Sequence, residues 1–265
     1  MISLFGPAYR SLNWESLHKK LSSTNKIEFE IVFCGPNSSA FSSQNFTHIL
    51  SNVKPVQCCE IARRRCKYDL IMLMPDDLMP SNGFLDCMYE KYLSEDRNNI
   101  VGSRMDGLSY LSYKFFPILG IPNIAVSGLL NKKEVDEIGG YDRNFLAIHH
   151  DIDLYHRLFE KKGGRTVFCR DDVRVRESVG DDWLYSTFWK HDRSVLNELW
   201  CKSQQDVISN NEQSNFHPAI YKEKDLKVGV DGDLMVSKYR LKKVEPFSDD
   251  NITETSQGAI DSYWN

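Results

Sequence analysis

The sequence predicts an α/β fold in which helices cover both faces of a mostly parallel sheet. Short apolar segments alternate with longer segments whose apolar residues recur every three or four positions. The short segments are apolar throughout, which is typical of strands buried on both faces. Several of them end at a proline or a glycine, which stops a strand and begins a loop. A chain of 265 residues is long enough to bury the core of one such domain.

The first part of the chain contains four expected strands and three expected helices. The strands are the apolar runs at residues 2–5, 28–34, 69–74 and 100–103. The helices are the segments at 12–21, 56–65 and 84–93, where apolar residues follow helical spacing. The polar segment 38–47 is expected to be a loop.

The second part is expected to begin with a loop and strand at 121–130 and a helix at 132–138. The glycines at 139–140 then make a sharp turn, and a helix at 151–161 ends at the helix-capping glycines 163–164. A strand at 165–169 and an aromatic-rich helix at 182–199 follow. The composition turns polar at 203–215. We therefore predict a main domain at 1–200 and a helical or irregular C-terminal extension at 201–265 that packs on it.

The composition of the chain limits the cellular compartments and the binding partners that we expect for the protein. The formal net charge of −4 gives no electrostatic reason to expect nucleic-acid binding. The 7 cysteines lack the spacing of a metal site or a disulfide framework, which favours free thiols in a reducing compartment. The start of the chain does not look like a secretory signal, and the longest apolar stretch is far too short to span a bilayer. We expect a cytoplasmic protein without a transmembrane segment, able to work at a membrane surface where its acceptor lies.

Three loops should meet at one edge of the predicted sheet, because ligands of such sheets bind beyond the carboxyl ends of the strands. They are the segments 6–10, 35–37 and 75–80. The last contains Asp76 and Asp77, and two adjacent carboxylates after a buried strand are costly without a cation. Their oxygens suit Mg²⁺ or Mn²⁺, with substrate phosphates completing the shell. The alternative is an Asp-rich turn in which one carboxylate caps the following helix.

Three further groups of residues could carry chemistry. Asp151 opens a helix and could act as a general base, although helix capping explains an aspartate there as well. Arg63 precedes the strand that leads to the aspartates and could bind a nucleotide or its diphosphate, although a solvated helix face is the alternative. Tyr9 or Arg10 could form the wall of a nucleobase pocket in the first loop.

Six segments occur in a fixed order and together carry a resemblance. They are the loop Gly6-Pro7-Ala8-Tyr9-Arg10, the loop Cys34-Gly35-Pro36-Asn37, the helical Ala62-Arg63-Arg64, the acidic Met74-Pro75-Asp76-Asp77-Leu78-Met79-Pro80, the turn Gly139-Gly140-Tyr141-Asp142-Arg143-Asn144-Phe145, and the helix start His150-Asp151-Ile152-Asp153-Leu154. In this order they resemble the inverting glycosyltransferases of the GT-A fold, specifically the large family 2. The resemblance spans roughly residues 1–180, and its last two segments are the most specific.

The resemblance implies transfer of a sugar from a nucleotide-diphosphate sugar to a hydroxyl group of a glycan, a lipid-linked acceptor or another acceptor. It implies inversion at the anomeric carbon, Asp151 as the general base, and Mn²⁺ or Mg²⁺ on Asp76 and Asp77 with a late histidine, His191, as a further ligand. The donor would be bound by Pro7, Ala8, Tyr9, Arg10, Asn37, Arg63, Asp76 and Asp77. The acceptor or the transferred sugar would lie beside Gly128, Gly140, Asp153 and Trp183.

The sequence also departs from the family pattern. The aspartate that contacts the nucleobase in many relatives is missing from 34–37, where Asn37 is the nearest substitute. The first acid of the Asp-x-Asp motif falls at Met74 or Pro75, and His150 stands where relatives have glutamate. These departures leave open a degenerate module that binds sugar nucleotides without turnover. A sugar-1-phosphate nucleotidyltransferase is also open, although the loop at 6–10 has too few glycines for that class.

Overall fold

A computed structural model of the chain describes residues 1–106, 125, 127–177, 182–200, 240, 242–250 and 252, with the backbone alone at 182–187 and 197. Its main sheet has seven strands in the order β3-β2-β1-β4-β8-β6-β9. They are β1 (Ile2–Pro7), β2 (Phe29–Gly35), β3 (Phe46–Leu50), β4 (Leu70–Leu73), β6 (Ile100–Gly102), β8 (Gly128–Asn131) and β9 (Thr166–Phe168). Strands β1 to β4 are parallel to one another, β6 and β9 are parallel, and β8 is antiparallel to both its neighbours. The predicted mostly parallel sheet is therefore confirmed.

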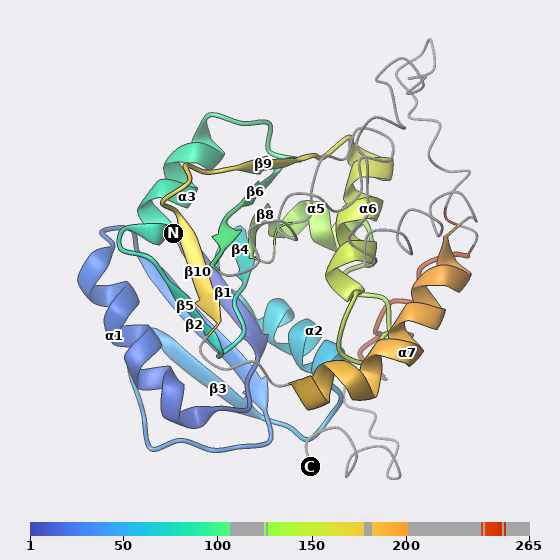
Figure 1. The fold of residues 1–265 in the computed structure, drawn as a ribbon, viewed down its shortest axis with the longest axis horizontal. Coiled ribbons are helices and arrows are strands. Elements are labelled where there is room, and N and C mark those ends of the chain that lie inside the picture. The colour runs from blue at the N-terminus through green and yellow to red at the C-terminus, as the bar shows by residue number, and fades with distance from the viewer. Residues whose placement is uncertain are drawn as a thin grey trace.

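Each face of the sheet is covered by helices (Figure 1). One face packs on α1 (Trp14–Thr24), which follows a short 3₁₀ turn at Ser11–Asn13, and on α3 (Phe84–Leu93). The other face packs on α2 (Pro55–Arg65), α5 (Lys132–Glu137), α6 (His150–Lys162) and α7 (Asp182–Leu199). Successive residues of one strand serve opposite faces: Leu4 joins the α1 side and Phe5 the α2 side. The core is therefore split into two layers by the sheet.

A second, small sheet was not expected from the sequence. It contains β5 (Leu78–Pro80), β10 (Arg174–Glu177) and β7 (Arg104–Met105), in the order β5-β10-β7. Strands of two to four residues are too short to show a period in sequence. The edge strand β3 was also missed, because its residues are partly exposed and polar residues precede it.

The last described residues pack on the main domain. Pro246 forms an isolated bridge with Asp142, and Arg240 forms one with Trp200. Phe247 is buried and belongs to the core layer on the α2 side of the sheet. The domain boundary at residue 200 stays a prediction. Among the described residues, no helix combines the length and the apolar character that crossing a bilayer requires.

Candidate active site

The loops after β1 and β2 meet at the carboxyl edge of the sheet. The backbone N–H of Ala8 donates to the carbonyl of Cys34 over 2.9 Å, and the side-chain amide of Asn37 donates to the carbonyl of Tyr9 over 2.7 Å. A Cβ atom at Gly35 would lie 1.8 Å from the Ala8 carbonyl oxygen, so only glycine permits this approach. The structure thus brings together Tyr9 and Asn37, two of the residues expected to bind the donor.

Asp76 follows β4 at the same edge and is almost completely enclosed, with 2% of its side chain exposed. Its Oδ2 atom accepts hydrogen bonds from the backbone N–H of Arg10 and from the indole Nε1 of Trp14, the latter over 2.9 Å. The side chain of Asn13 donates to its carbonyl over 3.1 Å. Burial raises the pKa of Asp76, and the bonds from Trp14 and Arg10 oppose that rise. Asp76 therefore ties the end of β4 to the start of α1.

Asp77 is the more accessible member of the pair, with 18% of its side chain exposed. Nη1 of Arg10 lies 3.2 Å from its Oδ2 and 3.5 Å from Oδ1 of Asp76, so one guanidinium bridges both carboxylates. Burial raises the pKa of Asp77 to about 6; the Arg10 charge opposes this shift, and the charges of Asp76 and Glu177 reinforce it.

Glu177 is a third acid at this place, and sequence reasoning missed it. It ends β10, which runs antiparallel to β5 and pairs it with Leu78, the residue after Asp77. Its side chain is exposed. The signal that could have found it is the pairing of two very short strands, which only the folded chain reveals.

The structure does not bring His191 to the acidic pair, within the side chains that it describes. Among the described side chains, no three His, Cys, Asp or Glu residues gather in a way that could hold a metal ion. His191 lies on α7, where its Nδ1 is 2.9 Å from the Asp192 carboxylate. Asp76 already uses Oδ2 for two donors, so Asp77 offers the accessible carboxylate. These residues fit a divalent cation whose coordination shell is completed by phosphate oxygens of the donor. They do not supply enough ligands for a cation that is coordinated by the protein alone.

Asp151 lies in the first turn of α6, two residues after His149, whose left-handed φ of 60° turns the chain into the helix. Its Oδ1 accepts a hydrogen bond from the backbone N–H of Ile152 over 2.8 Å, and its side chain is partly exposed. Its negative charge adds to burial in raising the pKa of Tyr155, one turn later. A Cβ at Gly128 would lie 2.6 Å from the Tyr155 hydroxyl oxygen. Asp151 and Gly128 are therefore neighbours through Tyr155, at the carboxyl edge of β4.

The loop before Asp151 is fixed by a carboxylate on another helix. Asp192 of α7 is completely buried and accepts the backbone N–H groups of Leu146, Ala147 and Ile148 over 2.7 to 2.8 Å. Three such bonds orient the backbone that leads into α6. Sequence reasoning singled out His191 and missed its neighbour Asp192.

Two residues expected near the acceptor take other places or cannot be described. Asp153 has no exposed surface, and its carboxylate binds Arg157 over 2.8 Å and Arg240 and Trp200 over 3.2 Å. It therefore holds α6 to the C-terminal segment, and the acceptor contact expected for it has no support in the structure. The side chain of Trp183 lies outside the described residues.

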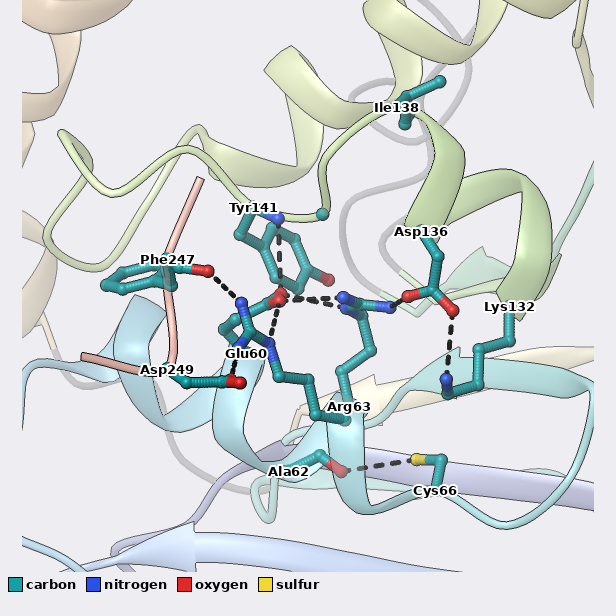
Figure 2. Close-up of polar contacts among 12 residues, drawn as sticks. Glu60, Ala62, Arg63, Cys66, Lys132, Asp136, Ile138, Tyr141, Phe247 and Asp249 are labelled. Atoms are coloured by element: carbon teal, nitrogen blue, oxygen red, sulfur yellow. Dashed lines mark hydrogen bonds and ion pairs between the residues drawn. The ribbon is translucent and has the colours of Figure 1, made fainter. Parts of the chain in front are cut away.

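Arg63 belongs to an ion-pair network with Glu60 and Asp136 (Figure 2), and Gly140 lies against this network. Arg63 donates to Glu60 over 2.7 and 2.9 Å and also pairs with Asp136. Glu60 accepts further bonds from Arg64 over 2.8 Å and from the backbone N–H of Tyr141 over 3.3 Å. Gly140 has φ +65°, and a Cβ there would lie 2.9 Å from Arg63 Nη2. The last turn of α2 leads to the start of β4, whereas the aspartates follow the end of β4. This network therefore lies near the amino end of that strand, at the edge of the sheet opposite the aspartates.

Known proteins resemble this chain in structure. No family model and no curated protein matches the sequence. S. aureus TarS matches with a TM-score of 0.58 and 11% identity over 87% of this chain, which spans about half the length of that protein (46%). Its segment 1–349 matches with a TM-score of 0.56, 12% identity, 87% of this chain and 76% of that one. A mannosyltransferase, PcManGT from Pyrobaculum calidifontis, solved with GDP-Man and Mn²⁺, matches with a TM-score of 0.60, 12% identity, 81% of this chain and 70% of that one. Together with the sheet order, these matches show the predicted GT-A-like fold.

Proposed function

We propose that this protein transfers a sugar from a nucleotide-diphosphate sugar to a hydroxyl group of an acceptor. The observation that carries the proposal is the convergence of Tyr9, Arg10, Asn37 and Asp77 at one sheet edge, with Asp151 at a helix start beside the same edge. The structural neighbours support it, because PcManGT was solved with GDP-Man and the TarS segment was also solved with UDP.

The donor would lie across the loops at the carboxyl edge. Tyr9 and Asn37 come from the loops after β1 and β2 and would face the nucleoside, while Arg10 would face the diphosphate. Mn²⁺ or Mg²⁺ arriving with the donor would find Asp77 as its accessible protein ligand. Such an ion would neutralise negative charge on the leaving diphosphate.

The acceptor would be activated by Asp151. In a single displacement, the acceptor oxygen attacks the anomeric carbon while the bond from that carbon to the diphosphate oxygen breaks, and the hydroxyl proton passes to the Asp151 carboxylate. This geometry inverts the anomeric configuration. The acceptor is a glycan, a lipid-linked sugar or another hydroxyl compound, and a lipid-linked acceptor would bring a cytoplasmic enzyme to a membrane surface.

Replacing Asp151 by asparagine tests the base. We expect Asp151→Asn to lower turnover by about 10²–10⁴-fold, the usual contribution of a general base. Donor binding should stay nearly unchanged, because Asp151 has no hydrogen bond or ion pair to the described residues of either donor loop. Transfer or slow donor hydrolysis is measured with nucleotide sugars, and UDP and GDP titrations report binding. The control is Asp172→Asn, an exposed aspartate in the turn before β10. Wild-type turnover in Asp151→Asn would show that another group takes the proton.

A binding module without turnover is the second candidate. It is favoured by the absence of the first motif acid, whose position falls at Met74 or Pro75, and by the Arg10 bridge across the remaining pair. Tight binding of sugar nucleotides by the wild type, with no hydrolysis or transfer on any donor and acceptor pair, would establish it.

A further inference from the structure

Arg10 lies in the loop after β1, directly before the 3₁₀ turn at Ser11–Asn13, and faces the two aspartates of the candidate site. Its guanidinium lies within 3.5 Å of both Asp76 and Asp77, and 18% of the side chain is exposed. The partial exposure gives the side chain a path toward solvent. The backbone N–H of the same residue is bound to Asp76, so the loop can stay in place if the side chain moves.

The guanidinium is needed where it lies because the acids crowd one another. Asp76 and Asp77 are adjacent, both are largely enclosed, and Glu177 adds a third negative charge across the small sheet. Enclosed carboxylates are costly unless a positive charge faces them. Trp14 and Asn13, which also contact Asp76, are neutral. Arg10 is therefore the counter-ion of this cluster in the donor-free protein.

A diphosphate approaching this cluster alone would meet more carboxylates than cations. A divalent cation approaching alone would have to compete with a guanidinium already bound between the two carboxylates. If both arrive together, the cation can take the carboxylates and the guanidinium can turn to the phosphates, for which its planar set of five donors is suited. Each carboxylate, the cation, the guanidinium and the diphosphate then lies next to a group of opposite charge.

We propose that Arg10 is an exchangeable counter-ion, which keeps divalent cations off Asp76 and Asp77 until the donor diphosphate is present and then pairs with that diphosphate. This role rests on the proposed donor site. It makes the binding of metal and the binding of donor depend on each other. Arg10 would weaken the binding of a divalent cation alone and strengthen the binding of the donor diphosphate.

Titrations of the whole protein with Mn²⁺ alone, and with UDP and GDP in Mn²⁺ or EDTA, test the proposal. We expect the wild type to bind Mn²⁺ alone weakly, and to bind UDP or GDP clearly better in Mn²⁺ than in EDTA. In Arg10→Ala, Mn²⁺ alone should bind about tenfold more tightly, because a cation within 4 Å of the carboxylates is gone, and the nucleotide with Mn²⁺ about tenfold more weakly. Arg10→Lys should keep Mn²⁺ binding weak, since it keeps the charge.

The control is Arg65→Ala, which removes an exposed arginine from the end of α2 before β4 starts. It should leave all titrations unchanged, and its thermal unfolding should match that of Arg10→Ala. Misfolding of Arg10→Ala would weaken both ligands, so tighter Mn²⁺ binding distinguishes the proposal from structural damage. Unchanged or weaker Mn²⁺ binding in Arg10→Ala, or equal nucleotide binding in Mn²⁺ and EDTA, overturns the role of Arg10 while the donor site stands. A wild type that binds neither UDP nor GDP in either condition overturns the proposed function and this role with it.

Discussion

At the scale of single residues, Asp76 and Asp77 are adjacent in sequence but have different structural roles. Asp76 is enclosed and is held by Arg10, Asn13 and Trp14, whereas Asp77 keeps part of its carboxylate exposed. Both residues lie in the turn between β4 and β5, and the difference arises because Oδ2 of Asp76 accepts bonds from Arg10 and Trp14. One aspartate therefore stabilises the edge of the sheet, and the other is available to a ligand.

Replacing each aspartate by alanine should separate the two roles. Asp76→Ala leaves the Trp14 indole and the Arg10 backbone N–H without their acceptor, which should cost on the order of 1–3 kcal/mol in the free energy of unfolding. Asp77→Ala should cost less than about 1 kcal/mol but weaken binding of UDP or GDP with Mn²⁺. Urea unfolding and nucleotide titration measure the two effects. Equal losses in the free energy of unfolding in both variants would contradict the proposed difference between the roles of Asp76 and Asp77.

The sequence could locate the acidic pair but could not divide its roles. The run of apolar residues up to Met74 placed both aspartates at a strand end, whereas Trp14 lies 62 positions away and only folding reveals its contact. Arg63 shows the opposite case. Glu60 is three residues before it on a helix, a spacing that favours an ion pair, and this local signal indicates an internal partner better than the family motif indicates a donor contact.

At the scale of elements, α7 controls the start of α6 through Asp192. The backbone at 146–148 has its N–H groups directed to one buried carboxylate, and the next residue, His149, adopts a left-handed conformation. A left-handed histidine is unfavourable by itself, so the surrounding bonds have to impose it. The position of Asp151 therefore depends on a helix more than 30 residues later in the chain.

Asp192→Ala should both destabilise the protein and displace Asp151. Losing the acceptor of three buried N–H groups should cost about 2–4 kcal/mol in the free energy of unfolding. Under the proposed function, turnover at saturating donor should fall more than donor affinity, which calorimetry and initial rates resolve. Glu198→Ala is the matched control, because this exposed acid of the same helix pairs with Lys242 at the surface. A variant that loses stability but keeps full turnover would show that Asp192 does not position Asp151.

Most elements of the main sheet could be predicted because their burial shows in the sequence. The bounds of α3 and of α7 were predicted without error, and β1, β2 and β4 were found to within two residues at each end. The direction of β8 could not be predicted, since an apolar run reads the same in either direction. The strands β5, β7 and β10 exist through pairing with one another, which no local pattern records.

At the scale of the whole molecule, buried charge joins segments far apart in the chain. Asp153 and Asp142 are completely buried, and Arg240 pairs with both, over 3.2 and 2.7 Å. Arg157 makes a further ion pair with Asp153 and donates to the carbonyls of Ile138 and Gly140. The turn at 139–142, helix α6 and the C-terminal segment therefore form one structural unit. Breaking a buried ion pair is more costly than losing an exposed one, because the remaining charge stays buried.

This unit contains a histidine that should make stability depend on pH. His156 is buried, with its ring centroid 5.1 Å from that of Trp200, and burial lowers its pKa to about 4, against the opposing charge of Asp153. An unfolded histidine has a pKa near 6.5, so between about pH 6.5 and 4 the unfolded state binds the proton and the folded state does not. The stability that neutral His156 contributes is therefore present above about pH 6.5 and is lost as the pH falls toward 4.

His156→Phe should remove this part of the acid sensitivity while keeping an aromatic ring against Trp200. In the wild type, this one histidine should lower the free energy of unfolding by up to about 3 kcal/mol between pH 6.5 and 4. Urea unfolding at half-unit steps from pH 8 to pH 4.5 should give parallel curves for the two proteins above pH 7, and a shallower decline for the variant below pH 6.5. Parallel curves over the whole range would mean that His156 accepts a proton as readily in the folded protein as in the unfolded one, and that the charge of Asp153 offsets burial.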